Sequence, residues 1–340
     1  MVDFRYHLVS LISLFLALSV GIILGAGPLQ NSIGEALTGQ VSALRADNAN
    51  LKQENDQLAT RAEAQDNAFA SLAPDMLGDS MKDRVVAIVR TADVPDATLN
   101  AITDSLKLTG ATMGTSVTLT TVWTDPAQAA YREPFAQQIS SYVADVDPEA
   151  DTNTILVAAL NQLVRVGADD ENNATLLELL SKSDTPLLNM SGELSPAADA
   201  VLLLTPDLEA PAVTEDKNAD AQAAAAVKND RDLYVKIATA FAQSGPTVVA
   251  GNANTAEDAV RMLREVGGKA SLVDTPDTAL GSLNVALALG HAIIGEQVDY
   301  GTESSAGAAI GTRVEAAKAQ EAAAEEAAQG QDAEAEAAGQ

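Results

Sequence analysis

Four carboxylates at alternating positions form the first group of residues that could do chemistry. They stand in the stretch DVDPEAD at positions 145–151, a spacing that suggests a calcium-binding loop. Such a loop needs a glycine at its sharp turn and a bidentate glutamate at its end, but Ala150 and Leu156 occupy those positions. We therefore interpret this stretch as a solvated loop.

A second candidate is the turn GNANT at positions 251–255, between a predicted strand and a predicted helix. Such a turn could cradle an anion at a helix start. It has one glycine and no lysine, so it is neither a P-loop nor a dinucleotide fingerprint, and Asn254 or Thr255 is predicted as a plain N-cap. No G-x-S-x-G or H-E-x-x-H motif occurs. We expect no catalytic residues, no cofactor site and no enzyme.

Soft metal ligands are few and dispersed. The chain has no cysteine, six scattered methionines and two histidines, His7 and His291. Copper sites favour grouped thiolate or thioether donors, and no such group exists in the sequence. His291 falls in an apolar predicted helix with no second ligand nearby, so a core or capping role is expected for it. The sequence therefore predicts no metal site.

The elements that position these residues begin with an uncharged apolar run at positions 8–27. About 20 residues of helix are enough to cross the hydrocarbon core of a bilayer. A cleaved signal peptide is the alternative, but the run is long for one, and Pro28 stands where cleavage would end it. Arg5 precedes the run, and Arg45 is the first basic residue after it. The length of the run and Pro28 predict an uncleaved anchor, residues 1–28. The charge bias predicts that the bulk of the chain lies outside the cytoplasm.

A heptad repeat follows the apolar run. Its spacing of four and three residues predicts a helical seam with leucine at d and asparagine at two a positions. The seam residues are Leu37, Val41, Leu44, Asn48, Leu51, Asn55 and Leu58.

This pattern favours a parallel homodimeric coiled coil over residues 29–73, because leucine at d suits two strands and asparagine at a fixes the register. A single amphipathic helix packed on its own domain is the alternative. Phe69 and Leu72 continue the spacing, and Pro74 is predicted to end the rod.

Alternating short apolar runs and helical segments predict an α/β domain with a mostly parallel sheet over residues 80–301. The expected strands are 84–90, 116–122, 185–190, 200–204, 246–251 and 270–273. The expected helices are 97–108, 134–143, 154–164, 174–181, 220–243, 255–266 and 278–294.

The net charge of the chain limits the kinds of partner that it can bind. The chain has 48 acidic and 20 basic residues, a formal net charge of −28, which opposes binding of nucleic acid and of anionic lipid surfaces by the soluble part. The last residues, 302–340, are rich in alanine, glutamate and glutamine with almost no large apolar side chain. They are predicted to form a disordered acidic tail.

A family resemblance accompanies these patterns. Beside the N-terminal RYHLVSL at position 5, the stretches VVAIVRTADV at 85, SVTLT at 116, AGNANTA at 250, VDTPDTALG at 273 and DYGT at 299 are similar to the mycobacterial copper transport protein family, MctB. The resemblance implies a cell-envelope protein with a role in copper efflux and homeostasis, described as pore formation in the outer membrane. Copper ion is then an implied partner.

Two classes of function therefore remain open. One is a transporter that carries copper, or helps to carry it, across the envelope. The other is a dimeric coiled-coil scaffold or regulator of cell-wall remodelling and cell separation, which acts through another envelope or membrane protein.

Overall fold

The computed structural model describes residues 4–314 except 183, 212 and 215, and of residues 24–36 it describes the backbone alone. The chain divides into two units, Met1–Gln65 and Asp66–Gln340.

Helix α1, Phe4–Leu77, includes both the apolar run and the heptad segment. Its first 20 residues, Phe4–Ile23, have a mean hydropathy of 2.1 and are not buried, so this helix is long and apolar enough to cross a membrane. The predicted end at Pro74 is wrong by three residues. Ala73 and Leu77 are buried in the core of the second unit, and this packing holds the last turn in place beyond the proline.

The second unit alternates strands and helices as predicted. The strands are β1 Val85–Arg90, β2 Thr112–Leu119, β3 Leu188–Ser191, β4 Ala200–Leu204, β5 Thr247–Ala250, β6 Ser271–Val273 and β7 Asp299–Tyr300. The helices after α1 are α2 Asp96–Leu108, α3 Ala129–Ile139, α4 Thr152–Arg165, α5 Asn172–Ser181, α6 Lys217–Ser244, α7 Ala259–Val266 and α8 Ala279–Ile293.

The seven strands form one sheet in the order β3-β2-β1-β4-β5-β6-β7. All neighbouring pairs are parallel except β2 with β3, which is antiparallel. Central strands such as β4 and β5 are buried on both faces, which explains their continuous Val and Leu runs. The predicted α/β class and mostly parallel sheet are therefore confirmed. The order of the strands reverses between β1 and β4.

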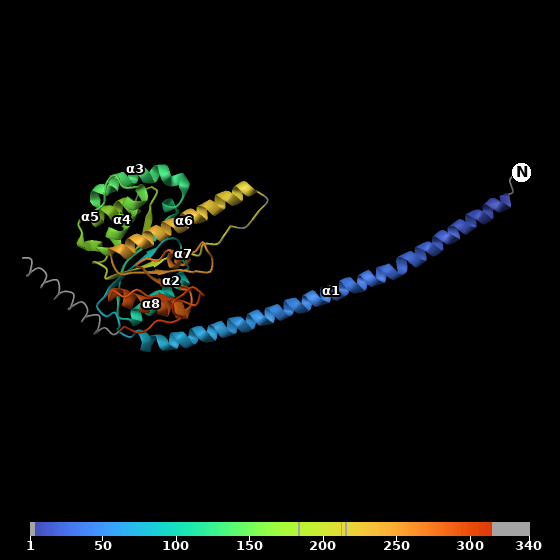
Figure 1. Cartoon of the computed structure of the whole chain (residues 1–340), viewed down its shortest axis with the longest axis horizontal. Helices are drawn as coiled ribbons and strands as arrows, with labels where there is room; N and C mark the ends of the chain where they lie inside the picture. Colours follow the sequence, from blue (N-terminus) through green and yellow to red (C-terminus); the bar gives the residue numbers. More distant parts are fainter. Residues whose placement is uncertain (1–3, 183, 212, 215, 315–340) are drawn as a thin grey trace, which may run out of the picture. The chain divides into compact units, whose positions relative to one another are not determined.

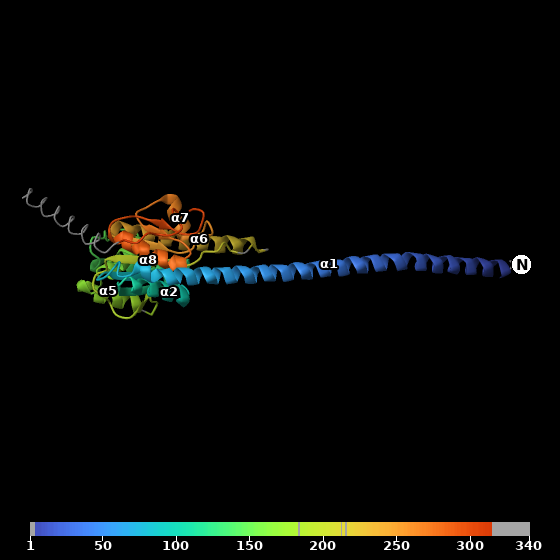
Figure 2. The same ribbon diagram turned by 90° about the horizontal axis from the view of Figure 1, so that it is seen from below.

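Helices cover both faces of the sheet (Figure 1). One core cluster joins α3, α4, α5, α6 and α7 to the sheet, and it contains the one tryptophan, Trp123. The other cluster joins α2, α8 and the last turns of α1 to the opposite face, where Figure 2 shows these three helices together. Phe69 packs in this second cluster, so it belongs to the α/β domain as well as to the heptad spacing.

Several predicted boundaries are corrected. Helix α3 begins five residues before Pro134, which lies inside it. Helix α7 begins at Ala259 and not at residue 255, and the two-residue strand β7 was not predicted.

Residues 302–314, assigned from the sequence to the acidic tail, pack on the domain. Val314 is buried, and the Arg313 guanidinium donates to the carbonyls of Asp75 and Gly78 at the end of α1. The predicted disorder of the rest of the tail concerns residues 315–340, which lie outside the described residues.

Asp151 illustrates how the acidic loop 145–151 is used. It is the N-cap of α4, where its Oδ1 accepts a hydrogen bond from Thr154 N at 3.1 Å and lies 2.8 Å from Lys236 Nζ. Burial opposes ionisation of the Asp151 carboxyl, but hydrogen bonds from Lys236 and Thr154 outweigh it and lower the pKa to about 2. The loop therefore supplies a helix cap, in keeping with its interpretation as a solvated loop.

We expect Asp151→Ala to lower the free energy of unfolding by about 1 kcal/mol at neutral pH, through loss of the cap. A depressed native pKa stabilises above the unfolded value of about 3.9, so the difference from wild type should shrink as the pH falls from about 4 to 2. Urea unfolding followed by Trp123 fluorescence at each pH measures this difference in the free energy of unfolding. Asp151→Asn keeps the cap and should lose less, and an alanine variant as stable as wild type at neutral pH would contradict the assignment.

Candidate functional site

A cavity of about 330 Å³ lies where four parallel strands end. It is lined by residues that follow the carboxyl ends of β1, β4, β5 and β6, on both sides of the reversal in strand order. In open α/β sheets, ligands bind in the crevice at such a reversal. The lining residues are Asp93, Val94, Pro95, Thr98, Thr205, Pro206, Asp207, Asn252, Pro276 and Asp277. We call this space the switch-point cavity.

Several positions around the switch-point cavity have a constrained backbone. Pro95, Pro206 and Pro276 each fix the backbone of a different lining loop. Thr275, next to Pro276, has φ +47, a left-handed conformation that is a genuine outlier for a β-branched residue. Its Oγ1 donates to the Asp274 carboxylate at 3.1 Å, which helps to hold this turn. Strain of this kind is typical of functional sites.

Carboxylates set the electrostatics of the cavity. Burial raises the pKa of Asp207, and the neighbouring Asp258, Asp277 and Glu209 raise it further, against a hydrogen bond from Asn252 that lowers it. Asn252 Oδ1 is buried and has no hydrogen-bond partner among the described residues. The described lining thus presents mainly acceptors, which suits a ligand that carries N–H or O–H donors or a positive charge.

The lining offers groups that could bind a ligand. Carboxylates, an amide and threonine hydroxyls surround the space, while the described lining residues include no histidine, lysine or serine that could form a nucleophile–base pair. The turn 251–255 contributes Asn252 to an acidic environment. These surroundings do not suit the anion site that was considered from the sequence. Neither Asn254 nor Thr255 is an N-cap, because Asp258 precedes α7 and accepts the Thr255 N–H at 2.8 Å.

Gly251 is required for the close approach of two lining loops. A Cβ at this position would collide with the Thr205 hydroxyl and lie 3.0 Å from the Thr205 carbonyl oxygen. We expect Gly251→Ala to destabilise the domain by about 1–3 kcal/mol through overpacking. Adding Thr205→Ala should recover part of this loss in thermal unfolding. Gly268→Ala, whose Cβ would meet nothing within 4 Å, is the matched control. Equal losses at Gly251 and Gly268 would refute the packing argument.

His291 is engaged on both sides of its ring. Nδ1 lies 2.6 Å from Glu296 Oε2, and Nε2 lies 3.0 Å from the carbonyl oxygen of Thr312. Because both ring nitrogens face acceptors, the side chain links α8 to residues 302–314 and offers no nitrogen to a metal. The core role expected for His291 is confirmed.

The methionines are divided between the two core clusters. Met76, Met81 and Met113 belong to the cluster on the α2–α8 face, whereas Met190 packs on the opposite face. In the described part of the chain, no three His, Cys, Asp or Glu side chains are grouped to hold a metal ion. A sequence spacing rule could not find the three methionines, because they come from α1, the turn after it, and β2.

The seam residues of the heptad are exposed to solvent in the single chain. Among them, Leu37, Val41, Leu44, Leu51 and Leu58 are 41–68 % exposed. The structure describes one chain, so their pairing with a second copy stays a prediction. Asn48 and Asn55 are also exposed.

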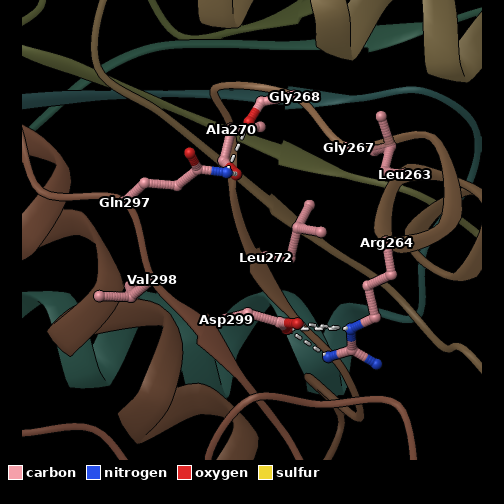
Figure 3. A pocket seen from close by; sticks show the side chains of 9 residues that line it. All are labelled: Leu263, Arg264, Gly267, Gly268, Ala270, Leu272, Gln297, Val298 and Asp299. Atoms are coloured by element: carbon pink, nitrogen blue, oxygen red, sulfur yellow. Dashed lines mark hydrogen bonds and ion pairs between the residues drawn. The ribbon is translucent and has the colours of Figure 1, made fainter.

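A second cavity, of about 240 Å³, lies at the β6–β7 edge of the sheet (Figure 3). Its polar groups satisfy one another. Arg264 points to Asp299, with Nη2 2.7 Å from Oδ1, and Gln297 Nε2 donates to the carbonyls of Gly268 and Ala270. We interpret this cavity as structural, since its described polar side chains are committed to one another.

The fold and the cavity define an α/β protein with a carboxylate-lined cavity at the switch point of its sheet and an N-terminal helix of membrane-spanning length. The profile of the family described as "Copper transport outer membrane protein, MctB" matches residues 1–311. The chain therefore belongs to the MctB family.

Curated relatives carry the same family name. The chain is 28 % identical over 120 residues to proteins named "Copper transporter MctB" from Mycobacterium bovis and from two strains of Mycobacterium tuberculosis. The matched segment is 35 % of this chain and 38 % of each relative. The chain thus spans well under half the length of these relatives in the match.

Proposed function

We propose that the protein is a single-pass, membrane-anchored protein of the cell envelope that takes part in copper homeostasis and has a binding rather than a catalytic role. The observation that carries this proposal is the unburied apolar segment Phe4–Ile23 at the start of a chain that belongs to a copper transport family. The α/β domain then lies outside the cytoplasm, as the charge bias around the span favours.

The topology is tested with reporters fused after residue 65, where the first unit ends. A reporter active only outside the cytoplasm should work, and one active only inside should not. The mature protein should retain its N-terminal segment. A mature chain that begins near Pro28 would replace the anchor with a cleaved signal peptide.

The copper role is proposed to be indirect, without a tight copper site in the α/β domain. His291 has both ring nitrogens engaged, which supports this proposal. The three methionines of the α2–α8 cluster are the donors that a direct role would use, because Cu(I) favours thioethers. Replacement of Met76, Met81 and Met113 therefore distinguishes an indirect copper role from direct copper binding.

The test is a triple replacement of these three methionines by leucine, a swap that conserves volume. A deletion strain should lose copper tolerance, and the triple variant should restore it as fully as wild type does. Met190→Leu with Met262→Leu is the matched control. Loss of tolerance in the triple variant alone, together with loss of Cu(I) binding in chelator competition, would establish direct handling.

A second candidate function is a dimeric scaffold or regulator that presents the α/β domain to an envelope partner. The exposed leucines of the heptad favour it, because apolar side chains at strict a and d spacing are buried by a second helix. Cell-separation defects in the deletion strain at normal copper concentration would support this function over copper homeostasis.

The two asparagines of the seam give a separate prediction. In a parallel dimer, Asn48 and Asn55 fix the register at a cost in stability. Replacing both with valine should raise the melting temperature of segment 31–73 and allow higher oligomers, as measured by circular dichroism and sedimentation. A lower melting temperature with unchanged stoichiometry would oppose their placement in the seam.

A further inference from the structure

One arginine of the α/β domain has no described partner. The other seven arginines in residues 66–314 donate to carboxylates or carbonyls, even where they are deeply buried, as Arg165 and Arg264 are. Arg90 makes no described hydrogen bond or ion pair, and its Nε is buried without a partner. It ends β1, beside the reversal in strand order.

A second unpartnered group lies next to it. Thr118 of β2 pairs in register with Arg90, so the two side chains stand on the same face of the sheet. Thr118 is 5 % exposed, and its Oγ1 has no described hydrogen-bond partner. The hydroxyls of Thr115 and Thr120 on the same segment are both bonded, so Thr118 is an exception. Two adjacent buried polar groups left unsatisfied indicate a missing ligand or water.

The same face is polar toward its β3 edge. Asn189 of β3 pairs with Thr118, and Ser191 of β3 pairs with Ser116 of β2, so all three stand on this face. Asn189 and Ser191 are exposed and Ser116 is half-buried. Helix α8 covers the same face over β4 to β7, and α2 with the last turns of α1 packs on it beside β1 and β2. The unpaired guanidinium therefore stands in a row of hydroxyl and amide groups that ends in the exposed Asn189 at the β3 edge.

We propose that Arg90, Thr118 and Asn189 form a binding site for an oxyanion group of a small molecule, a carboxylate or a phosphate. The planar guanidinium can donate two parallel hydrogen bonds to such a group, and the Thr118 hydroxyl and the Asn189 amide can donate further ones. The chain carries a net charge of −28, so long-range electrostatics oppose the approach of anions. Recognition consequently rests on these short-range donors. None of these three residues lines the acceptor-rich switch-point cavity.

The test uses the full chain in a neutral maltoside detergent, with unfolding of the domain followed by Trp123, its only tryptophan. Sodium succinate and inorganic phosphate are titrated against sodium chloride at equal ionic strength. Binding to the native state raises the unfolding midpoint. We expect at least one of the two oxyanions to raise the unfolding midpoint. The one that does so at the lower concentration shows whether the site prefers a carboxylate or a phosphate.

Arg90→Met should weaken the apparent affinity by about tenfold or more, because it removes the charge-assisted bonds. Arg261→Met, which removes an exposed arginine with the same change in charge, should leave the affinity unchanged. Thr118→Val should weaken binding while the unfolding midpoint without anion stays the same or rises, since an unsatisfied buried hydroxyl is replaced by an isosteric methyl.

Arg90→Lys keeps the positive charge but removes the planar guanidinium. It replaces Arg90→Met in the binding test if the methionine variant does not fold. It should still bind more weakly than wild type. The proposal is overturned if neither oxyanion raises the wild-type midpoint above sodium chloride, which would leave a buried water as the partner of both groups. It is overturned equally if the Arg90 variants respond as wild type does.

Discussion

Replacing Arg264 with methionine is expected to lower the free energy of unfolding of the α/β domain by about 3–5 kcal/mol, the usual cost of removing one partner from a buried ion pair. Arg264 Nη1 lies 2.9 Å from Asp274 Oδ2, and the two side chains are 4 % and 0 % exposed. The same guanidinium holds Asp299 of β7. Without it, the Asp274 carboxylate would keep its bonds from Thr302 N and Glu303 N but lose its only described cationic partner.

The matched control lies on the same helix. Arg261 of α7 forms an exposed pair with Glu265, and Arg261→Met should cost about 1 kcal/mol or less. Urea unfolding of both variants, followed by Trp123 fluorescence, makes the comparison. Similar small losses at Arg261 and Arg264 would mean that the buried pair contributes little to the attachment of β7.

Replacing Leu51 with aspartate is expected to abolish dimerisation of segment 31–73. Leu51 stands at a d position near the middle of the seam, so a dimer would bury two unpaired carboxylates facing each other. Concentration-dependent circular dichroism and sedimentation equilibrium measure the loss. If the scaffold function holds, the full-length variant should also lose activity in cells while its α/β domain stays folded.

Gln53→Asp provides the control, because position 53 falls at f, on the outside of the same heptad. This variant adds the same charge and should remain dimeric. A wild-type segment that is monomeric at high concentration would defeat the dimer, and so would full activity of a verified monomeric Leu51→Asp protein.

Strands and helices with strong local patterns were predictable from the sequence. The run at 84–90 matches β1 within one residue, because its β-branched side chains are buried on both faces. Strand β7 was missed, since a two-residue strand has no periodicity and exists through its pairing with β6 and the hold of Arg264 on Asp299. The start of α7 was placed too early because Asp258 binds Thr255 N and stabilises a loop there.

The candidate sites were harder to predict than the fold. Asp93, Asp207, Asn252 and Asp277 meet in the switch-point cavity from four loops spread over 185 positions of the chain. Each residue is unremarkable in its local sequence, and only the parallel direction of the strands brings the four together. Arg90 likewise ends a typical buried strand. Its lack of a partner is a property of the packed domain and leaves no trace in local sequence pattern.

The contact of Arg313 with the end of α1 has a mechanical consequence. The carbonyls of Asp75 and Gly78 receive their hydrogen bonds from Arg313, near the other end of the described domain, so the last turn of α1 is fastened to that end. Domains whose two ends lie close together tolerate insertion into another chain without a change in their fold. Tension applied through α1 would load its contacts with the domain, from the Ala279–Asp66 hydrogen bond to the Arg313 hydrogen bonds, before it reached the strands.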